Sequence, residues 1–355
     1  MTAWTYDRAP RRVYWELTRA CDLACRHCRA EARPARGAEE LETAQCLMVI
    51  RELATSTGEP APHIVFTGGD PLKRPDLLSL VDAAVSSGLP VAVAPSATFG
   101  VTGQAVGALR RAGIEAMSLS IDGASAARHD AIRGVLGCFG WTLAAAQRIV
   151  GAGIALQVNT LVCRETVGQL EAVADVVGRL GAARWSLFFL VPVGRGQVLT
   201  PLEPVEAEWT LRWLAARAGS WPFQATTTEA PQYRRVALQR AGDGPAVARA
   251  AARGLGMRDG NGVMFIAANG DVTPSGFLPL PTGNARQTSP LALYRTHPLF
   301  RALRDPDHFH GRCGVCPFRH VCGGSRARAW AASGDPLGED PLCAYDPGAQ
   351  KAAAA

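Results

Sequence analysis

The sequence predicts an α/β protein, built as an open, partial (β/α)6 barrel followed by a small C-terminal domain. Over the first two-thirds of the 355 residues, short β-rich runs alternate with longer amphipathic stretches. This alternation is typical of parallel strands joined by crossover helices. Six such units are too few to close an eight-stranded barrel. Two groups of closely spaced cysteines mark the first loop and the C-terminal region.

The expected elements follow one another in regular order. We expect strands at Arg12–Thr18, His63–Thr67, Val91–Pro95, Ala116–Ile121, Ile154–Val162 and Trp185–Val191. Helices are expected at Glu42–Thr55, Pro75–Ser87, Thr102–Ala112, Trp141–Ala152 and Val167–Leu180, each ending close to Gly or Pro. These elements make residues 1–200 the partial barrel.

Beyond the barrel, the pattern changes twice. Helices at Ala207–Ala218 and Pro245–Arg253 predict a helical linker over residues 201–258. Strands at Val263–Ala267 and Val272–Pro274 then flank the turn signal Asn269-Gly270. We therefore assign residues 259–355 to the small C-terminal domain.

Composition limits the possible locations and partners. Hydrophobic content is 48% and charged content 19%, as in ordinary globular proteins. The chain has no run of 18 apolar residues and no signal pattern, so we expect a cytoplasmic protein with no membrane partner. The net charge of +6 comes almost wholly from Arg, since Lys73 and Lys351 are the only lysines. Without a basic run, we expect no nucleic-acid partner.

Three cysteines follow the first strand in a C-x3-C-x2-C pattern: Cys21, Cys25 and Cys28. A four-iron, four-sulfur cluster normally takes four Cys ligands, so three leave one iron open to another ligand. The alternatives are a zinc knuckle, a disulfide with a spare thiol, and chance. Zinc would require a fourth Cys or His nearby, and His27 lies between two ligands, where it cannot easily turn back.

This spacing resembles the signature of the radical S-adenosylmethionine (SAM) superfamily. The resemblance implies that the open iron binds SAM, which is then cleaved reductively to methionine and a 5′-deoxyadenosyl radical. It also implies SAM contacts at the ends of other strands. Gly68 and Gly69 would let backbone approach the ligand, and Asp70 would take up its ammonium group. The family usually has Glu at that acidic position.

Strands four to six supply the other expected SAM contacts. The segment after strand four resembles the one that holds the SAM ribose and carboxylate in the family, which makes Ser120, Asp122 and Arg133 candidates. Asn159 alternates with apolar neighbours and should point inward; the alternative is a satisfied core amide. Leu190 ends strand six, where such enzymes commonly contact the adenine.

Four further residues are candidates for contact with the substrate. Glu229, Tyr233 and Arg234 lie in a Thr-Glu-x-Pro-x-x-Arg-Arg segment similar to segments found in relatives; the alternative is a plain helix N-terminus. Cys163 should point to the same side as Asn159 and would donate a hydrogen atom, with Cys138 as a weaker candidate. The alternative for both thiols is a small buried hydrophobe.

Four C-terminal cysteines form a second set, Cys313, Cys316, Cys322 and Cys343, spaced C-x2-C-x5-C-x20-C. They resemble the ligands of one auxiliary cluster in the SPASM/twitch extension of radical SAM enzymes. A full module carries another auxiliary cluster, whose ligand positions are here Ser275 and Arg326. A four-Cys zinc site is the alternative. The expected cofactors are a SAM-binding 4Fe-4S cluster, a second auxiliary 4Fe-4S cluster and SAM.

The resemblance is nearest to a group containing the haem-biosynthesis propionate-modifying enzymes, mycofactocin maturase and cytosylglucuronate decarboxylase. It implies a radical SAM decarboxylase, a carbon-carbon lyase, acting on a small specialised metabolite such as a sugar or nucleoside acid of antibiotic biosynthesis. A small-molecule substrate and an electron donor such as flavodoxin or ferredoxin are the expected partners.

Other functions remain open. They are sugar epimerisation or dehydrogenation, tetrapyrrole propionate modification and ribosomal-peptide maturation. About a dozen residues precede the first strand, too few for a leader-peptide-binding domain. A non-catalytic iron-sulfur electron carrier is a hypothesis of another class, but it would not need the polar residues at the strand ends.

Overall fold

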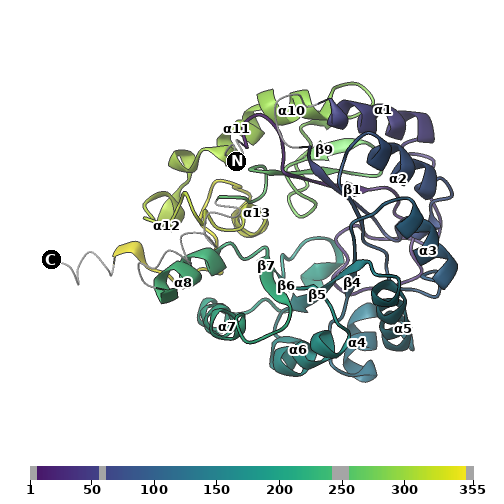
Figure 1. Cartoon of the computed structure of the whole chain (residues 1–355). Helices are drawn as coiled ribbons and strands as arrows, with labels where there is room; N and C mark the ends of the chain where they lie inside the picture. The colour runs from purple at the N-terminus through teal and green to yellow at the C-terminus, as the bar shows by residue number, and fades with distance from the viewer. Residues whose placement is uncertain (1–5, 56–60, 242–255, 349–355) are drawn as a thin grey trace.

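The computed structural model describes residues 6–55, 61–241 and 256–348. They contain one ten-stranded sheet with the order β10-β9-β8-β1-β2-β3-β4-β5-β6-β7. Its strands are Arg12–Glu16 (β1), His63–Thr67 (β2), Val91–Val93 (β3), Ala116–Ser120 (β4), Ala155–Val162 (β5), Arg184–Phe189 (β6), Gln224–Thr228 (β7), Val263–Ile266 (β8), Asp271–Thr273 (β9) and Gly283–Asn284 (β10). β8 and β1 to β7 pair in parallel, and β9 and β10 are antiparallel. Figure 1 shows the sheet curving into an open barrel.

The helices of the barrel lie on the outer side of this sheet (Figure 1). The helices are Thr43–Ala54 (α1), Leu77–Ser86 (α2), Gly103–Arg111 (α3), Ala126–Arg133 (α4), Cys138–Gly151 (α5), Leu170–Arg179 (α6), Pro204–Arg217 (α7), Gln232–Ala241 (α8), Pro290–Thr296 (α10), Pro298–Arg304 (α11), Gly311–Gly314 (α12) and Arg326–Ser333 (α13). The six predicted strands and the five predicted barrel helices are confirmed, with ends shifted by a few residues. Helix α4 was not predicted.

The main core lies between the sheet and the helices. Trp15 of β1 and Phe66 of β2 are fully buried there, with ring centroids 5.8 Å apart. Leu80 of α2 and Ile50 of α1 belong to the same cluster. Because neighbouring residues of a strand point to opposite faces, the alternate positions face the inside of the barrel.

Two parallel strands lie outside the predicted six. β7 extends the sheet beyond β6, and β8 pairs with β1 on the other side. β7 reads QATTT and lacks buried apolar residues, so its sequence carries no alternation signal. The partner of β8 lies about 250 residues earlier in the chain, and local patterns do not report such a pairing.

The expected linker is therefore not purely helical. Residues 201–258 contain α7 and α8, but also β7; the helix expected at Pro245–Arg253 lies outside the described residues. The predicted hairpin around Asn269-Gly270 is confirmed by the pairing of β8 with β9. The boundaries expected near residues 200 and 258 thus cross one continuous sheet. Among the described residues, no helix has the length and apolar character needed to cross a membrane.

Candidate active site and cysteine clusters

The first cysteine loop leaves the C-terminal end of β1. Cys21 and Cys25 are buried and Cys28 is half-buried. The Cys21 amide donates to the carbonyl of Arg33 at 2.8 Å, and the Arg26 amide donates to the carbonyl of Ile132 at 2.9 Å. These bonds anchor the loop to its own return segment and to the end of α4.

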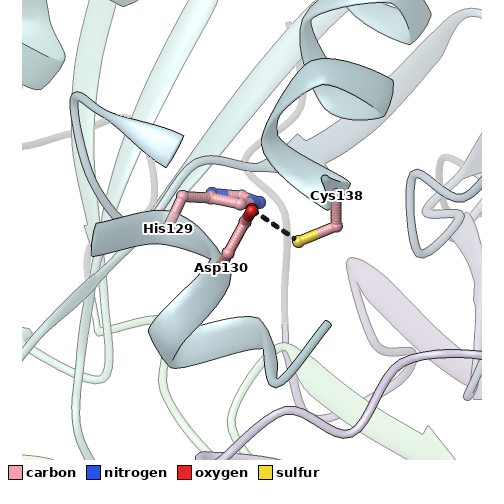
Figure 2. A group of neighbouring side chains, drawn as sticks. All are labelled: His129, Asp130 and Cys138. Atoms are coloured by element: carbon pink, nitrogen blue, oxygen red, sulfur yellow. Dashed lines mark hydrogen bonds between the residues drawn. The ribbon is translucent and has the colours of Figure 1, made fainter. Parts of the chain in front are cut away.

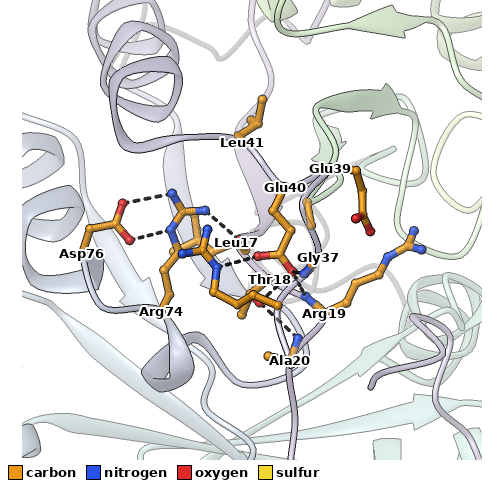
Figure 3. A network of polar contacts seen from close by, with 12 residues as sticks. Leu17, Thr18, Arg19, Ala20, Gly37, Glu39, Glu40, Leu41, Arg74 and Asp76 are labelled. Atoms are coloured by element: carbon orange, nitrogen blue, oxygen red, sulfur yellow. Dashed lines mark hydrogen bonds and ion pairs between the residues drawn. The ribbon is translucent and has the colours of Figure 1, made fainter. Parts of the chain in front are cut away.

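A buried polar network holds the entry to this loop (Figure 3). The carboxylate of Glu40 accepts from the Thr18 hydroxyl at 2.9 Å and from the Arg19 amide at 3.0 Å. Arg74 donates from Nη1 to the Leu17 carbonyl at 2.9 Å. Glu40 and Arg74 are each only 3% exposed, so these charge-assisted bonds are shielded from water. The network fixes the backbone just before Cys21.

The predicted glycine pair packs directly against the same backbone. The Gly69 amide donates to the Thr18 carbonyl at 2.8 Å, and the Asp70 amide donates to the Ala20 carbonyl at 2.7 Å. Gly68 has φ +151°, and a Cβ at Gly69 would overlap the Ala20 carbonyl oxygen. Only glycine permits this close approach, which joins the β2 loop to the cysteine loop.

Asp70 is fully engaged by the protein itself. Its Oδ1 accepts from the Leu72 amide at 3.0 Å, and its Oδ2 accepts from the hydroxyls of Ser96 at 2.7 Å and Thr98 at 3.2 Å. The side chain is 1% exposed. Its observed contacts are therefore those of a turn-capping residue, and the contact with SAM stays a prediction.

Asp122 and Arg133 form a buried ion pair beside the cysteine loop. Arg133 Nε lies 2.8 Å from Asp122 Oδ2, and Arg133 Nη1 lies 3.6 Å from Cys25 Sγ. Asp122 Oδ1 accepts from the Leu161 amide at 2.8 Å. Burial favours the neutral acid, but Arg133, the two nearby histidines and the Leu161 amide together outweigh it and hold the pKa of Asp122 below its usual value.

Ser120, the last residue of β4, lies beside Asn159 of β5, its registered partner. Both are half-buried, whereas their neighbours Leu119 and Val158 are buried in the core. The amide oxygen of Asn159 accepts from Gln157 Nε2 at 2.8 Å. This alternation of burial fits an inward Asn159, and its contact with SAM stays a prediction.

Buried polar side-chain atoms without a hydrogen-bond partner collect at this place. Of eleven such side-chain atoms in the described part of the chain, six belong to His27, Asp122, Arg133 and Arg195. The ion pair accounts for two of the six, leaving His27 Nδ1, Arg133 Nη2, and Nε and Nη2 of Arg195. Buried polar atoms are normally paired, so these donors fit an anionic ligand such as the carboxylate of SAM.

Sequence reasoning missed the side chains of His27 and Arg195. Burial, together with the nearby Arg133 and Arg195, lowers the pKa of His27 to about 4 against the opposing effect of Asp122. The Arg195 amide donates to the Cys28 carbonyl at 3.1 Å. This contact joins the loop after β6 to the cysteine loop, and no local signal indicates it.

Leu190 and Cys163 lie in one small buried cluster with Ile132, Leu161 and Leu199. The Leu190 amide already donates to the Val162 carbonyl at 3.1 Å, so Leu190 offers an adenine its side chain rather than a free amide. Cys163 is fully buried, and burial raises the pKa of its thiol to about 12. Its thiol packs within this cluster as a small hydrophobe does, and its sulfur lies 3.5 Å from the Thr166 hydroxyl; hydrogen donation stays a prediction.

The second cysteine set converges on one cavity, lined by all four of Cys313, Cys316, Cys322 and Cys343. A single zinc ion, with Zn–S near 2.3 Å, would bring its sulfurs to about 3.8 Å from one another. In the described chain, the only three metal-binding side chains with ligand atoms all within 4.8 Å are His129, Asp130 and Cys138. The wider spacing of both cysteine sets fits iron-sulfur clusters better than zinc.

The group of His129, Asp130 and Cys138 has a structural explanation (Figure 2). Asp130 accepts from the Cys138 thiol at 3.2 Å, and also from the amides of Gly137 at 2.7 Å and Phe139 at 2.8 Å. These bonds cap the start of α5. The carboxylate is thus saturated by its own chain, and nothing here indicates a metal.

Glu229, Tyr233 and Arg234 separate into different environments. Glu229 directly follows β7 with φ 55°, and its carboxylate accepts from the Ser325 hydroxyl at 2.5 Å. Burial, followed by the nearby Asp259, raises its pKa well above the usual value. Tyr233 packs against the main core. Arg234 donates to the carbonyls of Val321 and Met257, beside the second cysteine set. Of the three, Glu229 lies closest to the strand ends of the barrel.

Comparison with known proteins decides the family. Residues 15–177 match the model of the radical SAM superfamily. The chain is 37% identical to an AdoMet-dependent heme synthase of Methanosarcina barkeri, over 96% of this chain and 98% of the relative. It belongs to the radical SAM superfamily.

Two other similarities extend this result. Mycofactocin maturase MftC of Mycobacterium ulcerans is 33% identical over 96% of this chain and 89% of its own. The structure of Streptococcus suis SuiB bound to S-adenosylmethionine superimposes with a TM-score of 0.72 at 16% identity, covering 95% of this chain and 78% of that one. The latter shows the shared fold alone. As a radical SAM enzyme, the protein uses a 4Fe-4S cluster and SAM together with a reductant.

Proposed function

We propose that this radical SAM enzyme decarboxylates propionate side chains of a tetrapyrrole. The observation that carries the proposal is the full-length similarity to AdoMet-dependent heme synthase. It favours the tetrapyrrole alternative over the sugar or nucleoside acid that the sequence analysis preferred. Peptide maturation is the second candidate, and the similarity to mycofactocin maturase favours it.

In this proposal Cys21, Cys25 and Cys28 hold the first cluster. When bound, the cluster and SAM supply a 5′-deoxyadenosyl radical that removes one hydrogen atom from the substrate. Arg133 offers its free Nη2 to the carboxylate of SAM, and Asp122 keeps the guanidinium in place. Gly68 and Gly69 allow the close backbone approach that places SAM over the strand ends.

The chemistry also requires an electron acceptor. Hydrogen loss next to the CH2–COO⁻ group, followed by cleavage of the bond to the carboxylate carbon, gives a vinyl group, carbon dioxide and one electron. Among the described residues, the set of Cys313, Cys316, Cys322 and Cys343 is the group suited to hold an acceptor close to the barrel. A flavodoxin or ferredoxin is the proposed donor for SAM cleavage.

The test is an anaerobic assay of the reconstituted protein with SAM, a reductant and coproporphyrin, a porphyrin with four propionates. We expect substrate-dependent 5′-deoxyadenosine and a vinyl product by mass spectrometry, and neither product from the Cys25→Ala variant. The tetramethyl ester of the same porphyrin should stay unchanged. Formation of 5′-deoxyadenosine with unaltered porphyrin, in its free-base and iron forms alike, would contradict the proposal.

A further inference from the structure

Arginines surround the second cysteine set. Three of them, Arg235, Arg312 and Arg319, line the cavity itself. Each has a carboxylate partner: Arg235 pairs with Glu208, Arg312 with Glu339 and Arg319 with Asp307. The positive charge of these three is therefore largely compensated within the protein.

Arg326 is different, because no carboxylate lies within ion-pair distance of it among the described residues. Its charge helps to lower the pKa of Asp340 and of Asp335, but the ion pair of Asp340 is with Arg328. Arg326 is fully buried. Its Nη1 donates to the Gly338 carbonyl at 2.6 Å, and its Nη2 lies 3.5 Å from Cys313 Sγ. The guanidinium thus donates directly to a candidate cluster ligand. It also occupies one of the positions at which a fuller SPASM module is expected to hold another cluster ligand.

Arg258 and Arg234 repeat this arrangement on the side of Cys322. Arg258 is 6% exposed and donates to the carbonyls of Gly256 at 2.8 Å and Leu303 at 3.0 Å. Burial, Arg326 and Arg234 together lower the pKa of Arg258 to about 9. Carbonyl oxygens pair with Nη1 and Nη2 of Arg258, whereas its Nε has no partner. Carbonyls bring no net negative charge, and the nearby Asp259 only partly opposes the lowered pKa of Arg258, so buried positive charge remains to be balanced.

We propose that Arg326, Arg258 and Arg234 raise the reduction potential of an iron-sulfur cluster held by the second cysteine set. Four thiolates give such a cluster a net negative charge, which increases by one unit on reduction. Nearby buried positive charge that is not held in a direct ion pair therefore stabilises the reduced form more than the oxidised form. The N–H···S contact from Arg326 to Cys313 acts in the same direction.

A raised reduction potential would suit this cluster to accept the electron that decarboxylation releases. Only this role as electron acceptor rests on the proposed function. In that reaction the carbon-carbon bond to the carboxylate would break, carbon dioxide would leave and the new double bond would form, and the one electron released would pass to a cluster held by the second cysteine set. No proton is required. The arginines act as positioning and tuning residues, since none of them is placed against the reacting atoms.

The experiment is a redox titration of the full-length, two-cluster protein, followed by electron paramagnetic resonance. The variants are Arg326→Gln, Arg258→Gln and Arg234→Gln, with Arg326→Lys as the conservative variant. Arg301→Gln is the matched control, because Arg301 is exposed on α11. We expect the midpoint potential of the auxiliary cluster to become more negative in the three Gln variants. The SAM-binding cluster should keep its potential, and Arg326→Lys should recover part of the shift.

Parental potentials in Arg258→Gln and Arg234→Gln would overturn the proposal, and so would zinc at the second cysteine set. If Arg326→Gln loses iron, the potentials of Arg258→Gln and Arg234→Gln decide whether the proposal holds, since no hydrogen bond joins Arg258 or Arg234 to a cysteine sulfur among the described residues. A shifted potential in a protein that leaves porphyrin unchanged would support the tuning and contradict only the proposed substrate.

Discussion

At the scale of single residues, Arg133 connects the chemistry of the site to its stability. Its guanidinium is shared between Asp122 and Cys25, and its remaining donor has no partner in the protein. A buried arginine with one free donor is costly unless a ligand completes it. This makes Arg133 the clearest candidate for direct contact with SAM.

The first prediction follows from this geometry. Arg133→Ala and Asn159→Ala should each weaken SAM binding by about 1–3 kcal/mol, or roughly 5- to 150-fold in Kd, because each removes a hydrogen bond or charge from the ligand. Calorimetric titration of the reconstituted protein measures the effect. Arg128→Ala is the matched control, since Arg128 is exposed on the same helix. Parental affinity in both site variants would mean that SAM binds elsewhere.

At the scale of elements, the cysteine loop is held in place by its neighbours. Glu40 holds the backbone that leads into the loop, and the glycine pair after β2 hydrogen-bonds to the same backbone. The loop itself has little regular structure, so its conformation depends on these contacts. A flexible loop would lose conformational entropy each time it bound a cluster.

Glu40→Ala should therefore lower the free energy of unfolding by about 1–3 kcal/mol, because buried donors on Thr18 and Arg19 lose their acceptor. Anaerobic urea denaturation of the metal-free chain measures it. Glu39→Ala, next along the chain but exposed, should change stability by less than about 1 kcal/mol. Equal effects of the two substitutions would rule out the anchoring role of Glu40.

Gly69→Ala should reduce the iron retained at the first cysteine set, because the added methyl group displaces the Ala20 backbone. Gly107→Ala is the control: Gly107 lies within α3, and its new Cβ would meet only the end of the Arg111 side chain. Alanine at that helical position should be neutral or stabilising by up to about 1 kcal/mol. The measurement is the iron content of the two variants after identical reconstitution. An iron content in Gly69→Ala equal to that of the parental protein would refute the steric argument.

At the scale of the whole molecule, the two cysteine sets lie near opposite ends of the chain, but the strands that precede them are part of one sheet. β8, which leads into the C-terminal region, pairs with β1, which leads into the first cysteine loop. Arg328 of α13 also donates to the Leu190 carbonyl at the end of β6. The C-terminal region is thus fixed against the mouth of the barrel.

The reconstituted protein should carry roughly eight irons per chain, from two four-iron clusters. Replacing Cys21, Cys25 and Cys28 with Ala should leave about half of this iron and abolish 5′-deoxyadenosine formation. Metal analysis and chromatography measure both quantities. Zinc at the second set would instead give about four irons and one zinc. Continued SAM cleavage by the triple variant would contradict the assignment of its cysteines.

The sequence by itself determined the features that depend on local spacing. The first cysteine pattern, the glycine pair and the alternation within each of the first six strands can each be recognised from a few neighbouring residues, and the second cysteine pattern from the spacing of Cys313 to Cys343. Period-two and period-3.6 patterns report which face of an element is buried. The prediction that Asn159 faces the inside of the barrel could therefore be made from its neighbours alone.

Only the tertiary structure decided which distant residues meet. The pairing of β8 with β1, the unpartnered donors of His27, Arg133 and Arg195, and the contact of Arg326 with Cys313 each join segments far apart in the chain. Whether an arginine has a carboxylate partner depends on distances in space, which residue order does not encode locally. Charge balance at both cysteine sets was for that reason invisible until the chain was folded.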